Sequence, residues 1–111
     1  MKMKPAFEQR MELWSGTNFF EFRVGTVTGL YRYSIADHAF EILAIKNKIK
    51  GNGHFKVAMD YFEQSARREK AILRLCEVFN PRLYWNSVVH HGYRRKKGTI
   101  LTLEKTPLDS R

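Results

Sequence analysis

Residues 38–78, HAFEILAIKNKIKGNGHFKVAMDYFEQSARREKAILRLCEV, decide the fold of this chain. The run at 38–45 is apolar on both faces, which predicts a central strand covered on both sides. The run at 71–78 predicts a second strand, and the segment between the two follows the i, i+3, i+4, i+7 spacing of an amphipathic helix. Strand, helix and strand in this order predict a right-handed βαβ unit with parallel strands. The apolar stripe of the helix consists of Phe55, Ala58, Met59, Phe62 and Ala66.

The segments before this unit predict antiparallel strands. Residues 18–25 and 26–35 alternate apolar and polar side chains, which is typical of two half-buried strands in a hairpin or meander. Residues 1–14 predict a short helix, since four apolar side chains recur at helical spacing. These are Met3, Phe7, Met11 and Trp14.

The segments after the unit predict a helix and a hairpin. Asn80 and Pro81 are a favoured N-cap and first helical residue, and Gly92 is a favoured C-terminal stop. Residues 93–105 predict a closing hairpin that turns near Gly98. The buried stripe of this second helix is predicted to be Tyr84, Trp85, Val88 and Val89.

Together these elements predict one domain over residues 1–111. Its fold class is α/β (α+β), with a mixed, mostly antiparallel sheet and helices on both faces. The core covers about residues 18–105, and residues 106–111 are expected to be a loose tail.

The charge composition of the chain indicates which kinds of molecule it could bind. The chain has 20 Lys and Arg against 11 Asp and Glu, a net charge of +9. This charge favours an anionic partner, which leaves nucleic acid, a phosphate-bearing cofactor and an acidic protein open. No apolar run is long enough to span a bilayer, and no signal-peptide core is visible. The single cysteine, Cys76, fits a reducing cytoplasm, and its apolar surroundings predict a buried, unreactive thiol.

The turn KIKGNGH at residues 48–54 is the strongest candidate site. It joins a predicted strand to a helix N-terminus, where unpaired N–H groups and the helix dipole attract anions. Lys46, Lys48, Lys50 and Lys56 add positive charge. Without those features, two glycines indicate only a left-handed connection into a helix. A P-loop is excluded because His54 and Phe55 follow Gly53, and a dinucleotide fingerprint is excluded because Lys56 stands at its third small position.

The order of these features resembles the GNAT acyl-CoA N-acyltransferases. KIKGNGH is similar to the family's Q/R-x-x-G-x-G/A turn, with Lys48 at the Gln/Arg position. NPRLYWNSVVHHGY, residues 80–93, resembles the family's element of an Asn, a short helix and a Gly-Phe ending. The antiparallel strands before the turn also match, so the resemblance covers about residues 18–105.

The resemblance implies that the strands around 41–46 and 71–78 splay apart and hold acetyl-CoA between them. The pantetheine arm would then pair with Leu43, Ala44, Ile45 and Lys46. The pyrophosphate would lie on the N–H groups of Lys48, Ile49, Lys50, Gly51, Asn52, Gly53 and His54, and Asn80 would complete the cofactor site. An amine would attack the thioester directly, with a base taking its proton and an acid protonating the thiolate.

The sequence offers more than one candidate for the catalytic base and for the acid. Glu41 is a candidate base because a carboxyl between apolar residues would have a raised pKa if buried. A rim glutamate paired with lysine is an equal alternative, and Glu77 is a second candidate. Val88 occupies the position of the family's tyrosine acid, so Tyr84 or Ser87 would have to replace it. The family's elements before residue 18 are reduced here to one short helix, and a homodimer or a large acceptor could supply the missing wall.

Two other clusters have simpler interpretations. His90 and His91 point about 100° apart on a helix, and no spacing of Cys and His indicates a metal site. The run RRKK, residues 94–97, indicates either a solvated rim or a patch for an acidic acceptor or nucleic acid. The sequence therefore predicts an N-acetyltransferase that uses acetyl-CoA, no metal and an unknown amine acceptor. The alternative is a catalytically silent protein of the same fold that binds nucleic acid or an acidic protein.

Overall fold

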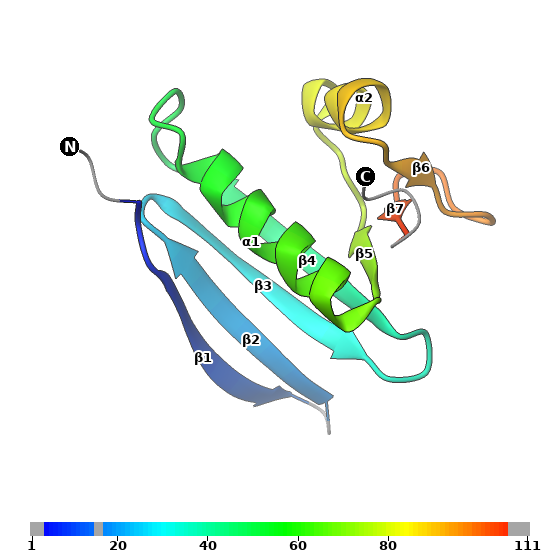
Figure 1. The fold of residues 1–111 in the computed structure, drawn as a ribbon, viewed down its shortest axis with the longest axis horizontal. Helices are drawn as coiled ribbons and strands as arrows, with labels where there is room; N and C mark the ends of the chain where they lie inside the picture. Colours follow the sequence, from blue (N-terminus) through cyan, green and yellow to red (C-terminus); the bar gives the residue numbers. More distant parts are fainter. Residues whose placement is uncertain (1–3, 15–16, 107–111) are drawn as a thin grey trace.

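The strands of this protein form one mixed sheet, and the computed structural model describes residues 4–14 and 17–106. Within that part of the chain, the sheet has seven strands in the order β1-β2-β3-β4-β5-β7-β6, together with two helices (Figure 1). The elements are β1 (Phe7–Trp14), β2 (Thr17–Val24), β3 (Val27–Ser34), β4 (Ala39–Asn47), α1 (His54–Glu69), β5 (Ile72–Leu75), α2 (Pro81–His90), β6 (Arg94–Arg95) and β7 (Leu103–Lys105).

The predicted βαβ unit is confirmed. β4 and β5 are parallel neighbours connected through α1, and all other neighbouring strands are antiparallel. β4 is the fourth strand of seven, so its predicted central place is also confirmed. Glu41 and Ile42 are both buried although successive strand residues point to opposite faces. Near these residues the sheet is therefore covered on both sides.

The helix predicted at residues 1–14 is wrong, because residues 7–14 form the edge strand β1. Phe7 and Met11 are four residues apart, a spacing that puts them on one side of a helix and also on one side of a strand. Packing decides between the two. The ring of Phe7 stacks on Phe22 and on Tyr61, so the strand extends an aromatic core. Met3 lies outside the described residues.

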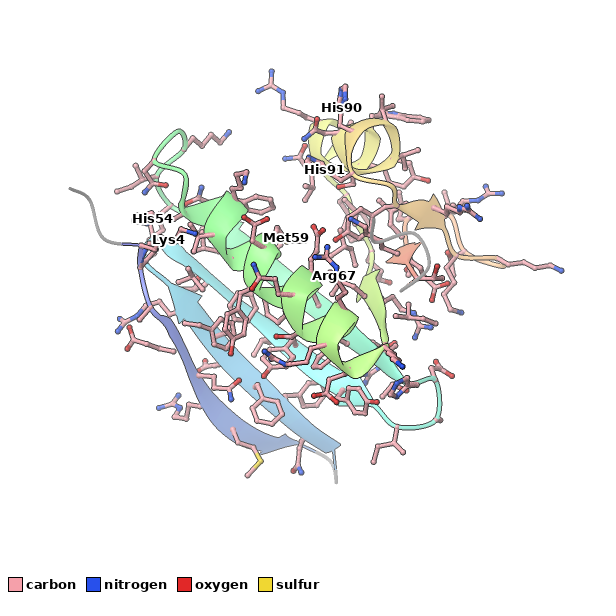
Figure 2. The ribbon with its side chains drawn as sticks, viewed as in Figure 1. Lys4, His54, Met59, Arg67, His90 and His91 are labelled. Atoms are coloured by element: carbon pink, nitrogen blue, oxygen red, sulfur yellow. The ribbon has the colours of Figure 1, made fainter. Side chains whose placement is uncertain are left out.

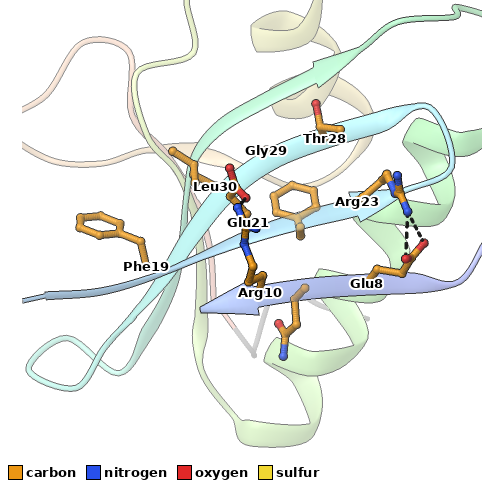
Figure 3. A pocket seen from close by; sticks show the side chains of 10 residues that line it. Glu8, Arg10, Phe19, Glu21, Arg23, Thr28, Gly29 and Leu30 are labelled. Atoms are coloured by element: carbon orange, nitrogen blue, oxygen red, sulfur yellow. Dashed lines mark hydrogen bonds and ion pairs between the residues drawn. The ribbon is translucent and has the colours of Figure 1, made fainter. Parts of the chain in front are cut away.

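The main core lies between the sheet and α1. α1 contacts β2, β3, β4 and β5 and buries Ala58, Phe62 and Ala66 against them. Over β1–β3, no helix of the described chain covers the opposite face, where an open groove lies instead (Figure 3). The prediction of helices on both faces is therefore wrong for this part of the sheet. The buried apolar cluster comprises Phe22, Val24, Val27, Tyr31, Ile42, Ala58, Phe62, Ala66, Leu73, Leu75, Val78, Tyr93 and Leu103.

The start of α2 is confirmed, and half of its predicted stripe is wrong. The side chain of Asn80 accepts hydrogen bonds from the N–H groups of Arg82 and Leu83, as an N-cap does. Tyr84 and Val88 pack against the core, but Trp85 and Val89 are 62% and 66% exposed. α2 lies beyond the end of β5 (Figure 1), so it has less sheet to cover than a helix that crosses the strands.

The closing hairpin is confirmed as β6 and β7, and Gly98 in its turn has φ 84°. Residues 107–111, most of the predicted tail, lie outside the described part. No helix in residues 4–14 and 17–106 combines the length and the apolar character needed to cross a membrane.

Candidate functional site

A slot opens where β4 and β5 part. The two strands pair only from Ala39 to Ile42 on β4, and the N–H of Cys76 makes one further hydrogen bond to the carbonyl of Ile42, 2.9 Å long. Two residues later, the N–H of Val78 donates instead to Leu101, at 2.7 Å. The chain thus leaves β4 for the β6–β7 hairpin, which is the predicted divergence of the two strands.

The slot has a volume of about 350 Å³, within the range of small-molecule sites. Residues of β4, α1, the segment after β5 and the start of α2 line it. They are Ile42, Leu43, Ala44, Ile45, Phe55, Met59, Leu75, Cys76, Glu77, Val78, Phe79, Asn80 and Leu83. Of the predicted cofactor residues, Leu43, Ala44, Ile45 and Asn80 are therefore brought together here.

A β-bulge interrupts β4 at the slot. Leu30 pairs with Ala44 and Tyr31 with Ile42, so Leu43 is an extra residue without a partner on β3. A bulge re-aims the backbone of one strand and is frequent beside functional sites. Gly29 permits the close approach of β3, because a Cβ there would come within 2.2 Å of the carbonyl oxygen of Ala44.

The glycine turn lies at the end of β4 and begins α1. Gly51 and Gly53 have φ 84° and 81°, and Gly53 is the N-cap of the helix. An added Cβ at either position would meet nothing within 4 Å. The protein itself therefore does not crowd these positions. Glycine adopts this left-handed backbone conformation without strain. Because it has no Cβ, it also leaves the N–H groups of the turn open to a ligand.

Side chains of the turn fasten it to the β2–β3 connection. Asn52 donates to the hydroxyl of Thr26 at 2.8 Å, and its Oδ1 accepts from the N–H of His54 at 3.0 Å. The N–H of Thr26 donates to Nδ1 of His54 at 3.1 Å. His54 lies at the end of α1 that adjoins this connection (Figure 2), so its Nδ1 is already engaged with protein.

The predicted anion donors divide into two groups. The N–H of Lys48 donates to Thr26 at 3.1 Å and that of Ile49 to Asn47 at 3.3 Å, so these two serve the turn itself. No hydrogen bond within the described chain occupies the N–H groups of the predicted donors Lys50, Gly51, Asn52 and Gly53. The N–H of Lys56, which was not among the predicted donors, is open as well.

Lysine side chains add positive charge beside these open donors. Lys46, Lys48, Lys50 and Lys56 are all exposed around the turn, with Lys56 also 3.2 Å from Asp60. The open donors and this charge form an anion site of the kind found at helix N-termini.

Glu41 lies in a buried ionic network, and its expected raised pKa is wrong. Burial raises the pKa of this carboxyl, but hydrogen bonds and charge from Arg32 and Arg74 outweigh it and hold the pKa below its usual value. Arg32 lies 2.6 Å away on β3, and Arg74 pairs from β5 while also contacting Glu104 on β7. The four side chains form one row across neighbouring strands. Neither earlier alternative describes Glu41, since its partners are arginines and it is buried.

The candidate acid Tyr84 is not among the residues that line the slot. Its hydroxyl donates to the carbonyl of Ile100 at 3.2 Å. Val88, at the family's tyrosine position, is half-buried against the core, and Ser87 is buried within α2. The structure therefore does not bring a tyrosine or serine hydroxyl of α2 into the slot.

Cys76 and Glu77 also line the slot; the sequence predicts the first as an unreactive thiol and offers the second as an alternative base. Cys76 is half-buried, and burial together with the Glu41 carboxylate raises the pKa of its thiol. A raised pKa keeps the thiol protonated, as the sequence predicts for an unreactive cysteine. What marks both residues as slot residues is their position in the chain, directly after Leu75, the last residue of β5 that pairs with β4.

A larger groove of about 950 Å³ lies on the uncovered face of β1–β3 (Figure 3). Its charged side chains are already paired, with Arg23 3.0 Å from Glu8 and Arg10 2.7 Å from Glu21. The slot is the better candidate site despite its smaller volume, because it lies between diverging strands and reaches Phe55 in the first turn of α1, although none of residues 48–54 lines it.

The histidines do not gather into a further site. His90 and His91 lie on and just after α2, apart from His54 (Figure 2). Within the described residues, no three side chains of His, Cys, Asp or Glu are placed to hold a metal ion. No family model, curated protein or solved structure matches the chain.

Proposed function

We propose that this chain is an N-acetyltransferase that binds acetyl-CoA in the slot between β4 and β5. One observation carries the proposal: a bulged strand parts from its parallel neighbour and then leads into a glycine turn with open N–H groups. An extended thioester with a diphosphate at its far end needs these two parts in this order. The sequence resemblance to the GNAT family points to the same ligand.

The extended arm of the cofactor pairs with β4 in this proposal. Beyond Ile42, no strand of the described chain pairs with the β5 side of β4, so the backbone of residues 43–46 can bond a ligand there. Apolar side chains such as Leu83 and Met59 line the slot and exclude water from the arm. The diphosphate then lies on the N–H groups of Gly51, Gly53 and Lys56, with the four lysines around it.

The chemistry in this proposal is direct transfer. The amine nitrogen attacks the thioester carbonyl, a C–N bond forms, and the C–S bond breaks to release the CoA thiolate. In this proposal the backbone N–H at the Leu43 bulge stabilises the developing oxyanion, a contribution that preorganised donors make in acyl transfer. Glu41 holds β4 in place through its arginine partners and is not assigned as the base, since its low pKa makes it a weak proton acceptor.

A thermal-shift experiment tests this function. Acetyl-CoA at one hundred times its Kd should stabilise the protein by about 2.7 kcal/mol, measured as a rise in Tm. ATP at the same concentration is the control for a general effect of phosphate on a basic protein. The absence of any shift with millimolar acetyl-CoA, or an equal shift with ATP, would count against the proposal.

A binding protein without catalysis is the second candidate. Two observations favour it: the net charge of +9, and the absence of an α2 hydroxyl from the slot. In that case RNA or DNA binds with an affinity that falls steeply with salt, and no CoA thiol is released. A mobility-shift assay at two salt concentrations, run beside a thiol-release assay, separates the two functions.

A further inference from the structure

Glu77 is the one charged residue among the described residues that line the slot. The other lining residues are apolar, apart from the thiol of Cys76 and the amide of Asn80. Glu77 is exposed, and no hydrogen bond or ion pair within the described chain engages its carboxylate. Glu41 differs in both respects, because it is buried and paired with two arginines.

The backbone of Glu77 has a conformation that residues with a Cβ rarely adopt. Its φ is 52°, in the left-handed region that normally selects glycine or asparagine. Such a conformation persists only where surrounding structure fixes it, and it is enriched at functional sites. At this position the residue is a glutamate, so the conformation has a free-energy cost that glycine would avoid.

Three hydrogen bonds fix this conformation. The N–H of Cys76 donates to Ile42, that of Glu77 to the hydroxyl of Thr102 at 3.3 Å, and that of Val78 to Leu101. Successive residues are thus held by β4 and by the segment that leads into β7. Glu77 therefore has a defined place at the slot, unlike a glutamate on a free loop.

We propose that Glu77 is the residue that binds the acceptor, and that the acceptor is a protonated alkylamine. This inference rests on the proposed acetyltransferase function. An alkylammonium group has a pKa near that of lysine and is positively charged at neutral pH. A carboxylate attracts it, whereas a net charge of +9 on the protein as a whole repels it. Phe79, which is 73% exposed and also lines the slot, is an aromatic residue that could contact the same cation through its ring.

Glu77 also balances the protons of the transfer. The ammonium first gives one proton to the Glu77 carboxylate, which frees the nitrogen lone pair. After attack and loss of the C–S bond, the nitrogen gives a second proton to the CoA thiolate, which leaves as a thiol. The Glu77 carboxylic acid then releases its proton to water. The products are an N-alkylacetamide, CoA and one proton.

Release of CoA thiol from acetyl-CoA tests the inference with two nucleophiles. Butylamine is mostly a cation at neutral pH, and hydroxylamine is mostly neutral. Glu77→Gln should lower the rate with butylamine by about tenfold or more, since it removes a charge-assisted contact. The rate with hydroxylamine should stay within about twofold, because no charge is recognised there. Glu69→Gln, an exposed glutamate at the far end of α1, is the matched control.

The variant Glu77→Gly distinguishes a loss of amine binding from a loss of stability. Glycine adopts the left-handed backbone without strain, so this variant should melt at the same temperature or higher. It should still lose the selective rate with butylamine. Two results would overturn this inference alone. In the first, acetyl-CoA binds normally and Glu77→Gln reacts with butylamine as fast as the wild type does. In the second, the wild type transfers the acetyl group to hydroxylamine but not to butylamine. If the wild type does not bind acetyl-CoA at all, both the inference and the proposed function fail.

Discussion

The backbone N–H of Cys76 donates to the carbonyl of Ile42 over 2.9 Å, and beyond this bond β4 and β5 no longer pair in the described chain. The slot begins at this bond. Leu43, at the β4 bulge, lines the slot from one strand, and Glu77, which follows β5, lines it from the other chain segment. The proposed thioester therefore lies where the sheet itself supplies unpaired backbone groups.

Gly53→Asp should abolish the acetyl-CoA thermal shift. The change puts a carboxylate among the open N–H donors of the glycine turn and strains a backbone with φ 81°. Gly98→Asp is the matched control, since Gly98 has φ 84° and also leaves an added Cβ free of contacts within 4 Å. A Gly53→Asp protein that keeps the full shift would show that the turn does not hold the phosphates.

Alkylation of Cys76 reports directly on occupancy of the slot. The chain has one cysteine, so a single mass increment with iodoacetamide identifies the site. Acetyl-CoA should slow this reaction several-fold by covering the thiol. Since burial raises the pKa of Cys76, the rate should keep rising with pH beyond the range in which an ordinary thiol ionises. Equal rates with and without acetyl-CoA would contradict a ligand in the slot.

Arg74→Met should destabilise the protein strongly. The Arg74 side chain is 6% exposed and that of Glu41 8%, and loss of the arginine leaves a buried carboxylate with reduced compensation. Such losses cost about 3–5 kcal/mol, measured by urea unfolding. Arg10→Met, in an exposed pair with Glu21, should cost less than about 1 kcal/mol. Similar losses for the two variants would show that burial of the network contributes little.

The same network predicts a dependence of stability on pH. The pKa of Glu41 is lower in the folded protein than its ordinary value of 4.5, so its contribution is complete above that value. Stability should fall as the pH drops below 4.5 and through the folded pKa, where the carboxyl becomes protonated. Arg74→Met removes one of the two charges that lower the pKa, so its unfolding free energy should change less over this interval. An equal acid loss in variant and wild type would assign the effect to other carboxylates.

Asn80 has two proposed roles that substitutions can separate. Asn80→Ala removes the helix cap and should cost about 1 kcal/mol of stability. Asn80→Asp keeps an oxygen that accepts from Arg82 and Leu83 and should retain most of the stability. If the amide also contacts the cofactor, Asn80→Asp should weaken acetyl-CoA binding in calorimetry. Unchanged affinity in this variant would restrict Asn80 to capping.

The elements of the fold that depend on local signals could be predicted from the sequence. The periodicity of α1, the Asn80–Pro81 start of α2 and the glycine of the closing hairpin each act within a few residues. The edge strand β1 could not be predicted in this way, because the spacing of Phe7 and Met11 fits a helix and a strand equally. Its state is set by pairing with β2 and by the stacking of Phe7 on Phe22 and Tyr61.

The candidate site divides in the same way. The glycine turn is contiguous in sequence and was predictable, whereas the partners of Glu41, Arg32 and Arg74, come from two other strands. Glutamate between apolar neighbours indicates burial but not which charge lies opposite. The conformation of Glu77 was equally hidden, since it follows from hydrogen bonds to Thr102 and to residues on both sides.

The most direct test of the central claim is an amide chemical-shift map of the ¹⁵N-labelled protein during titration with acetyl-CoA. If acetyl-CoA binds between β4 and β5, the largest shifts should occur at residues 43–46, 48–56 and 76–80, with little change in β1 or in the β6–β7 hairpin. The opposite result is an absence of shifts at millimolar acetyl-CoA, or shifts confined to the groove on β1–β3. Either of those would contradict a cofactor site between β4 and β5.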